Sequence, residues 1–325
     1  MCALVSAGFA VVATSTKNVT AQERRATDGN TPLGDALMDR LARAKGGETI
    51  TLEPGDYGWV RFPAREFTPA IRIDARKALF RGIVLRNAGG VTISGGRVEG
   101  TSKAGKSRGV ELAAVRNVAI ENMTISGAWK GIAMGRSDGV RIEGNTLTGL
   151  GSEGLSIALS RNVIVRGNSC SNFSPTKTTY NPDGSILVAG DHPDCIQAWS
   201  RPKMPPTADV LVENNTISGP IQGIFFGNHV RKGVDDGGFD RVIIRNNKVN
   251  VTHPHGIAIT DARDSQITGN EVVTLPGGIN RKRPSARVRS NLNIKGAVRT
   301  IACENRVADF PNSPHSGRCP KAISR

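Results

Sequence analysis

The sequence predicts an all-β solenoid in which short strands stack coil upon coil. A line of alternating apolar residues that closes on asparagine, Val140-Arg-Ile-Glu-Gly-Asn145, returns with small changes before Asn168, Asn215, Asn247 and Asn270. These asparagines are 23, 47, 32 and 23 residues apart, which indicates a period near 23 with two insertions. Each unit also carries a second apolar run, such as Gly131-Ile-Ala-Met134. Aromatic residues make up only 4%, which favours a narrow core of stacked aliphatic side chains.

The repeated lines predict strands joined by tight turns. Ile and Val alternate with polar residues, which is typical of strands with one face inward. The Gly-Asn and Asn-Asn pairs favour turns because both residues accept positive φ at low cost. Strands this short cannot bury a core alone, whereas stacked coils can. We expect the aligned asparagines to form an internal ladder at a bend, with solvated turn asparagines as the alternative.

The two ends of the chain differ from the repeats. Residues 33–46 predict an amphipathic helix with a glycine stop, which would cap the first coil. We expect one elongated domain over residues 22–325, ending in a tail at about 300–325. Residues 2–14 are apolar but too short to span a bilayer, and with Val19-Thr-Ala21 they resemble a secretory signal over residues 1–21. The expected location is therefore periplasmic or secreted, without membrane insertion.

The charge balance points to a polyanionic partner. There are 43 Lys and Arg against 28 Asp and Glu, a formal net charge of +15. No basic helix, zinc-ligand spacing or aromatic-rich sheet motif of nucleic-acid-binding proteins occurs, so we expect no nucleic-acid partner. The alternative is that much of this charge is an ordinary solvated surface.

The cysteines give two candidate pairs. Cys303 and Cys319 lie 16 residues apart near the C-terminus and would close a loop in an oxidising compartment. Cys170 occupies an inward repeat position, where we expect a buried free thiol. A bridge to Cys195, which takes a glycine position at the start of a strand, is the alternative.

Stacking brings residues from successive coils together. The residue before the second apolar run is in turn Lys130, Glu153, Asp194, Gln222 and His255. In a stack these five residues would be neighbours about 4.8 Å apart along one wall. We call them the polar column. An ordinary exposed rim would also be polar, so the neighbouring residues carry the functional interpretation.

Further candidate site residues surround the polar column. Two insertions, at residues 171–194 and 228–241, interrupt the repeat, and excursions from a regular scaffold often carry binding loops. The candidate catalytic residues are Lys130, Glu153, Asp194 and His255 of the column, together with His192. The candidate substrate-binding residues are Gln197, Trp199, Gln222, His229, Arg231, Lys232, His253, Asp261 and Arg263. An acid, an imidazole and several cations in one groove would suit uronate chemistry.

The cap helix, the Gly46-Gly-Glu-Thr-Ile-Thr-Leu-Glu-Pro-Gly-Asp-Tyr57 line and the asparagine-marked coils carry a family resemblance. They resemble the right-handed parallel β-helix of the pectate-lyase-like superfamily over roughly residues 33–310. That superfamily includes polysaccharide lyases, C5-epimerases, polygalacturonases and tailspikes. The resemblance implies an acidic polysaccharide as the partner and leaves the individual sugar and the oligomeric state open.

Individual segments resemble polygalacturonases in part. Asp194-Cys-Ile resembles their catalytic D-D-C-I segment, His255 their G-H-G strand, and Asn293-Ile-Lys295 their R-I-K. Pro193 replaces one acid of the pair and Asn293 replaces the arginine. Because inverting hydrolysis needs an acid and a separate base, hydrolysis would require Glu153 beside Asp194. Glycoside hydrolysis is therefore an alternative.

The lyases and epimerases of this superfamily imply a different reaction. They neutralise a uronate carboxylate with Arg, Lys or Ca²⁺, and a base then removes the C5 proton. His255 or His192 would be the base. His192-Pro-Asp194 has the ingredients of the epimerase D-P-H-D segment in another order. Asp235, Asp236 and Asp240 are candidate Ca²⁺ ligands, with a solvated turn as the alternative. We expect β-elimination or C5 epimerisation, with a non-catalytic glycan-binding or tailspike-like module as a further alternative.

Overall fold

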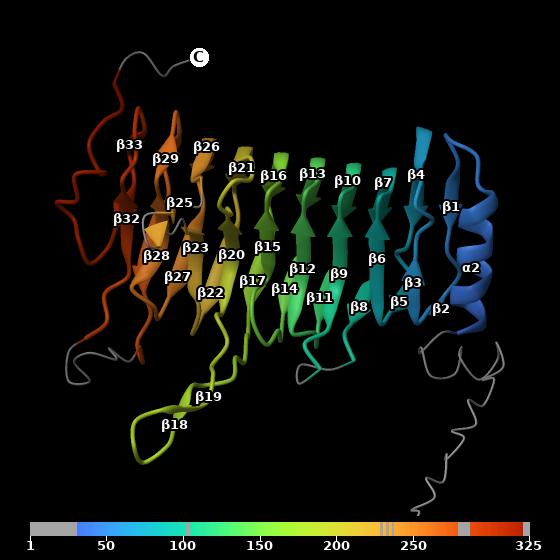
Figure 1. The fold of residues 1–325 in the computed structure, drawn as a ribbon, viewed down its shortest axis with the longest axis horizontal. Coiled ribbons are helices and arrows are strands. Elements are labelled where there is room, and N and C mark those ends of the chain that lie inside the picture. The colour runs from blue at the N-terminus through green and yellow to red at the C-terminus, as the bar shows by residue number, and fades with distance from the viewer. Residues whose placement is uncertain are drawn as a thin grey trace, which may run out of the picture.

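The chain winds into a long stack of coils, and helix α2 (Pro32–Arg43) lies at the N-terminal end of the stack (Figure 1). The computed structural model describes residues 31–101, 105–227, 230–231, 234–235, 237–278 and 287–320. The coils of the described chain build three parallel sheets that run along the stack. The predicted all-β solenoid is thus confirmed as a parallel β-helix. As expected, the chain bends at Asn145, and Leu147 lies in the short strand that follows.

The three sheets are named A, B and C, in the order in which the chain first enters them. Sheet A contains β1 (Thr49–Thr51), β4 (Glu66–Asp74), β7 (Gly89–Ser94), β10 (Arg116–Glu121), β13 (Asp138–Glu143), β16 (Arg161–Arg166), β21 (Thr207–Glu213), β26 (Phe239–Arg245), β29 (Ala262–Arg263), β30 (Gln266–Thr268) and β33 (Ile301–Cys303). Sheet B contains β2 (Gly55–Asp56), β5 (Ala78–Phe80), β8 (Arg97–Glu99), β11 (Thr124–Ser126), β14 (Thr146–Thr148), β17 (Ser169–Ser171), β22 (Thr216–Gly219), β27 (Lys248–Val251), β31 (Glu271–Thr274) and β34 (Arg306–Val307). Sheet C contains β3 (Trp59–Arg61), β6 (Gly82–Arg86), β9 (Arg108–Ala113), β12 (Lys130–Gly135), β15 (Leu155–Ala158), β20 (Asp194–Trp199), β23 (Gln222–Gly227), β28 (His255–Thr260) and β32 (Asn291–Lys295).

The core is a continuous column of aliphatic side chains inside the coils. Equivalent residues pair across the sheets, so a spine of valines in sheet A joins Val118, Val140, Val163, Val210 and Val242. All five valines are buried. Each such side chain contributes about 1.5–3 kcal/mol through removal from water. Because the layers repeat, the apolar pattern fixes the register of every coil on the next.

Both ends of the stack are covered. Helix α2 (Pro32–Arg43) starts at Thr31, whose hydroxyl accepts from the Gly34 amide at 3.1 Å, and buries Leu37 and Leu41 on the first coil. The cap predicted at 33–46 is confirmed, although the helix ends at Arg43. The tail predicted from residue 300 is partly a further coil, because β33 and β34 extend sheets A and B. The proposed signal, residues 1–21, lies outside the described residues.

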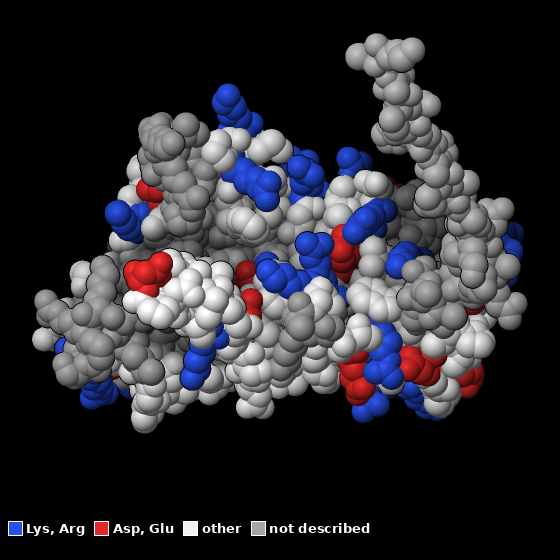
Figure 2. All heavy atoms as spheres, turned by 60° about the horizontal axis from the view of Figure 1, so that its bottom comes forward, with Lys and Arg blue, Asp and Glu red and all other residues white. Residues whose placement is uncertain are grey.

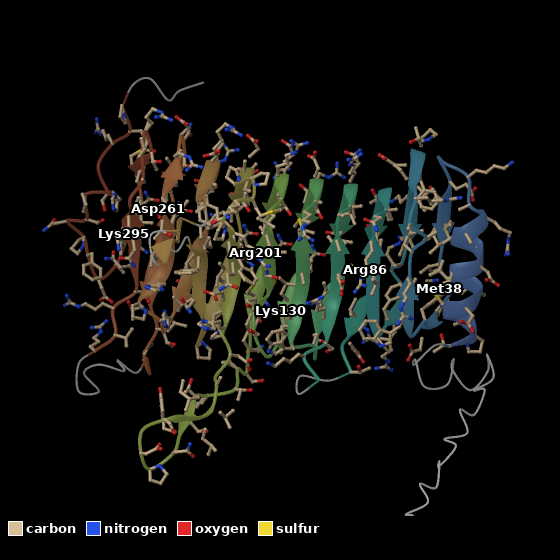
Figure 3. The ribbon with its side chains drawn as sticks, viewed as in Figure 1. Met38, Arg86, Lys130, Arg201, Asp261 and Lys295 are labelled. Carbon is tan, nitrogen blue, oxygen red and sulfur yellow. A yellow bond between two sulfur atoms is a disulfide. The ribbon has the colours of Figure 1, made fainter. Side chains whose placement is uncertain are left out.

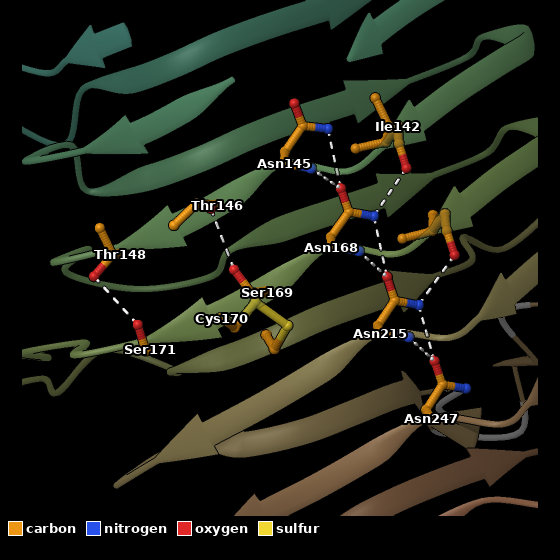
Figure 4. The surroundings of a disulfide bond; sticks show 12 residues. Ile142, Asn145, Thr146, Thr148, Asn168, Ser169, Cys170, Ser171, Asn215 and Asn247 are labelled. Atoms are coloured by element: carbon orange, nitrogen blue, oxygen red, sulfur yellow. Dashed lines mark hydrogen bonds between the residues drawn. A yellow bond between two sulfur atoms is a disulfide. The ribbon is translucent and has the colours of Figure 1, made fainter. Parts of the chain in front are cut away.

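The predicted asparagine ladder is confirmed (Figure 4). The backbone and side-chain amides of Asn145 both donate to Oδ1 of Asn168, at 2.9 and 3.0 Å, and Asn145 Nδ2 also reaches the Ile120 carbonyl of the preceding coil. The pattern repeats through buried asparagines at Asn168, Asn215, Asn247, Asn270 and Asn305. Asn305 was not predicted, because its coil departs from the sequence pattern. Each amide ties three coils together and satisfies polar groups that water cannot reach.

Cys170 and Cys195 form a disulfide, so the expectation of a free thiol at Cys170 is wrong (Figure 4). The reason lies at the corner where sheet B leads into sheet C. A Cβ atom at Gly154, the equivalent position one coil earlier, would stand 3.1 Å from the Cys170 sulfur. A cysteine at that position in the next coil therefore points at Cys170. Cys303 and Cys319 also form a disulfide, as predicted.

The two predicted insertions leave the stack as short hairpins. Residues 171–194 carry β18 (Thr179–Tyr180) and β19 (Ile186–Val188). These two strands pair as a hairpin, which we call the arm and which projects from the side of the stack (Figure 1). The second insertion carries β24 (Val230–Arg231) and β25 (Val234–Asp235). The disulfide between Cys170 and Cys195 joins the two ends of the insertion that bears the arm.

Replacing one ladder residue should weaken the whole stack. In Asn215→Ala, the Asn168 amides lose their acceptor and the Val165 carbonyl loses its donor, so we expect the free energy of unfolding to fall by about 3 kcal/mol. Chemical denaturation followed by circular dichroism measures this loss. Asn250→Ala, a half-buried asparagine on β27 outside the ladder, is the matched control and should change stability by under about 0.5 kcal/mol. Equal effects of the two variants would contradict a special role for the ladder.

Candidate active site

The structure brings the five residues of the polar column together on successive coils. Asp194 and Gln222 are Cα partners at the starts of β20 and β23. Lys130 Nζ lies 3.0 Å from Glu153 Oε1, and the Gly154 amide donates to the Asp194 carbonyl. At the other end of the column, His255 Nδ1 lies 3.0 Å from Gln222 Oε1. The predicted adjacency is confirmed, and it follows from the coil register.

At one end of the column, one lysine and two acids form a buried cluster. Lys130, Glu153 and Asp194 are 9%, 5% and 0% exposed. Within the described chain, Glu153 Oε2 and both carboxyl oxygens of Asp194 are buried without a hydrogen-bond partner. Burial, together with the nearby charge of Glu153, raises the pKa of Asp194 to about 8, although Lys130 opposes the shift. Asp194 therefore carries a proton at neutral pH, and buried unpaired carboxyl oxygens of this kind point to function rather than to stability.

The other half of the column is a neutral imidazole. The ring of His255 stacks on Phe225 with centroids 5.3 Å apart and meets the His253 ring edge-on at 5.2 Å. The His255 backbone amide donates to His253 Nδ1 at 3.2 Å. Burial lowers the pKa of His255, because a charged ring is poorly solvated there. The ring is therefore available as a base at neutral pH.

The outer face of sheet C forms a surface beside the column. Ser156, Gln197, Phe225, Ala258 and Asn293 are Cα partners in turn across its strands, and they form one row. The labelled side chains of Arg86, Lys130, Arg201 and Lys295 are spread along the stack (Figure 3). The row crosses β20, β23 and β28, which begin with column residues, so a ligand bound along it would lie beside the column.

Trp199 provides an aromatic surface at the end of β20. Its side chain is 39% exposed. The Arg201 guanidinium carbon lies 5.5 Å from the ring centroid, and Lys130 Nζ lies 6.0 Å from it. A flat ring with cations on its flanks suits a sugar that bears a carboxylate.

The positive charge of sheet A is largely matched by acids on the same sheet. Ion pairs of 2.6–3.1 Å run from coil to coil across its outer face, joining Glu121, Arg141, Glu143, Arg166, Glu213 and Arg245. On the face turned forward in Figure 2, Lys and Arg lie on both sides of a shallow depression. A polyanion is therefore better accommodated away from sheet A.

Sequence reasoning missed two residues that hold the segment before Asp194 in place. The Trp129 indole donates to Asp191 Oδ1 at 2.7 Å, and Asp191 Oδ2 accepts from the Thr176 amide. Burial alone would raise the pKa of Asp191, but these hydrogen bonds outweigh it and lower the pKa. Ser152 Oγ also donates to the His192 carbonyl at 3.2 Å, while His192 itself is exposed. The available signal was the tryptophan directly before Lys130.

Other predicted site residues lie away from the column. Asp261 sits in the turn that follows β28, past the opposite end of the strand that His255 begins. Arg263 belongs to β29 in sheet A, where its guanidinium bonds the Asp240 carboxylate. Arg263 is thus not placed to bind a substrate beside the column, because the chain has already turned into sheet A.

Of the three suggested Ca²⁺ ligands, only Asp240 has a described side chain. The Asp240 carboxylate is already paired with Arg263. Over the described ranges, no group of three or more His, Cys, Asp or Glu side chains is arranged to hold a metal ion. His229, Lys232 and Asp236, with the side chains of Arg231 and Asp235, lie outside the described residues.

Comparison with known proteins agrees with the observed fold. A family model described as the right-handed β-helix region matches residues 81–292, and the chain belongs to this family. The helix is therefore right-handed, as the resemblance implied. No curated protein sequence matches the chain. In the part of the chain that is described, no helix is both long enough and apolar enough to cross a membrane.

Several solved structures share the fold. The Dettilon tailspike protein has a TM-score of 0.50 at 12% identity, covering 84% of this chain and 57% of its own. A mannuronic acid specific polysaccharide family 6 lyase from human gut microbiota has a TM-score of 0.50 at 11% identity, covering 84% and 62%. The A-module of the Azotobacter vinelandii mannuronan C-5 epimerase AlgE6 has a TM-score of 0.48 at 13% identity, covering 86% and 83%. This chain thus spans about three fifths of the first two, and the likeness shows the fold alone.

The protonated state of Asp194 predicts an unusual pH dependence of stability. Its carboxyl binds a proton more tightly in the folded chain, so the free energy of unfolding should fall as pH rises from about 4 to about 8. Asn mimics the protonated acid, so Asp194→Asn should match the parent near pH 4 and exceed its stability by about 4 kcal/mol near pH 7. Chemical denaturation across this pH range measures the difference.

Asp138→Asn is the matched control for this experiment. Hydrogen bonds from Asn162 and Arg161 lower the pKa of Asp138, so removing its charge should destabilise the chain, and more so at higher pH. A pH-independent difference between Asp194→Asn and the parent would contradict the proposed protonation state of Asp194.

Proposed function

We propose that this chain acts on an acidic, uronate-containing polysaccharide, removing the C5 proton in β-elimination or C5 epimerisation. The observation that carries the proposal is the pair of Asp194 and His255 on one wall. Their environments displace the two pKa values so that the acid is protonated and the imidazole is neutral at the same pH. A reaction that needs one general acid and one general base requires two groups with pKa values displaced in this way.

The residues around this pair support defined roles. A sugar ring stacked on Trp199 would place its carboxylate near Arg201, whose positive charge would stabilise the enolate-like anion formed at C5. His255 would remove the C5 proton. Asp194, two coils away at about 10 Å between Cα atoms, would give its proton to the leaving oxygen or to the opposite face of C5. One sugar residue would lie between their side chains.

Asp194 is closed off from solvent, so its proton transfer requires local opening. We expect the neighbouring segment 191–193 to move, because it lies directly before Asp194, and its movement would break the hydrogen bonds from Trp129 and Ser152. Opening of this segment would let substrate enter, and closing it again would exclude water from the reaction.

Composition, fold and disulfides support the same class of substrate. The formal charge of +15 favours a polyanion, and a mannuronic acid specific lyase shares the right-handed β-helix. The two disulfides favour an oxidising compartment, so we place the protein in the periplasm or outside the cell.

Glycoside hydrolysis by Asp194 with Glu153 is less well supported. The two acids lie on adjacent coils, and Glu153 Oε1 is paired with Lys130 at 3.0 Å. An inverting hydrolase separates its carboxyl groups by about 6.5–9.5 Å to admit water between them, and a retaining enzyme needs an accessible nucleophile. Glu153 and Asp194 are buried side by side, which suits neither arrangement.

Activity on a panel of alginate, pectate, glucuronan and glycosaminoglycans tests the proposal. We expect ultraviolet absorbance from unsaturated ends, or a change in C5 stereochemistry seen by NMR. His255→Ala and Asp194→Asn should each lower kcat by about 100-fold or more, because each removes an acid or base. Trp199→Ala should mainly raise KM.

The matched control is Gln266→Ala on β30 of sheet A, which should leave turnover unchanged. New reducing ends without unsaturation would select hydrolysis instead. Binding without turnover of any polymer, unaffected by joint loss of Asp194 and His255, would identify a glycan-binding module and refute the enzymatic proposal.

A further inference from the structure

The side chain of Gln222 touches the ring on which the proposed base depends. A neutral imidazole carries one proton that can sit on either nitrogen, and only the other nitrogen can accept a proton from substrate. Gln222 Oε1 lies 3.0 Å from His255 Nδ1. A carbonyl oxygen can only accept a hydrogen bond, so this contact requires the proton on Nδ1 and leaves the lone pair on Nε2.

We propose that Gln222 is a positioning residue that fixes the tautomer and orientation of His255, rather than a ligand of the substrate. The catalytic consequence rests on the proposed function, whereas the tautomer does not. The inference departs from the expectation, drawn from sequence, that Gln222 binds substrate.

Gln222 is itself held firmly enough to orient a ring. It is 8% exposed, and its backbone amide donates to the Pro193 carbonyl at 2.8 Å. Phe225, on the same strand, stacks on the imidazole and restricts its rotation. Strand β23 therefore presents both a hydrogen-bond acceptor and a flat face to His255, and together these set the ring plane and the proton position.

The groups packed against the ring explain why an amide suits this position. On β23 the ring meets Gln222 and Phe225, and on β32 its Cα partner is Asn291, so neither strand places a charge on it. His253, on the segment before β28, takes the backbone amide of His255 on its Nδ1. A carboxylate in place of Gln222 would orient the ring equally well but would raise the pKa of His255. Gln222 thus supplies orientation without charge and keeps the base neutral.

Nitrogen-15 NMR of the full chain with labelled histidine tests this directly. The parent should show His255 protonated at Nδ1. Gln222→Leu removes the acceptor and should shift His255 toward the Nε2–H form. Gln222→Glu should keep the Nδ1–H form and raise the pKa of His255 by about 1 unit or more. Gln266→Leu, on the far sheet, should change neither property.

Kinetics on the polymer that is turned over provides the second measurement. Gln222→Leu should lower kcat by about 10-fold or more with KM nearly unchanged, and Gln222→Glu should move the acidic limb of the pH profile to higher pH. An Nε2–H tautomer in the parent, or an unchanged tautomer in Gln222→Leu, would overturn the proposal. So would a Gln222→Leu effect confined to KM, which marks a substrate ligand. If no polymer is turned over, the proposed function fails while the NMR result still decides the role of Gln222.

Discussion

The coil-to-coil register is the constraint on which the rest of the molecule depends. No single coil buries enough apolar surface to persist, so each layer of aliphatic side chains needs the next. The buried asparagines tie these layers together, because the Asn168 side chain accepts hydrogen bonds from the preceding coil and donates to both neighbouring coils. A slip by one residue would place every side chain on the wrong face and break the ladder at the same time. Cooperative stacking is thus what brings distant residues into one wall.

Much of the fold was predictable because the repeat uses residue types whose structural preferences are known. Alternating Val and Ile gave the strands, and the fixed place of Asn145 and its counterparts gave the ladder. The bend was also predictable, because Gly-Asn and Asn-Asn pairs favour turns, and Leu147 lies in a separate strand beyond it. Asn305 was missed because it follows Asn270 by 35 residues, far from the period near 23, and because Ala302 stands where its counterparts have Ile or Val.

The candidate site was predictable only where it follows from register. Lys130, Glu153, Asp194, Gln222 and His255 came together because the sequence gives their places in the repeat. Arg263 was misplaced, because the chain turns from sheet C into sheet A directly after β28, and the sequence does not mark that turn. The hydrogen bond between Trp129 and Asp191 joins residues separated by an insertion, and no spacing rule reaches across it. Burial, which sets the state of Asp194 and His255, is likewise a property of the packed chain.

The disulfide at the root of the arm has a wider consequence. Because Cys170 and Cys195 hold the entry and exit of the insertion together, we expect the stack beneath to depend little on the hairpin of β18 and β19. The arm is therefore free to diversify in length and chemistry during evolution, or to accept a grafted segment, while the strand that starts with Asp194 keeps its place. Specificity for long substrates would then change through the arm at little cost to the chemistry below it.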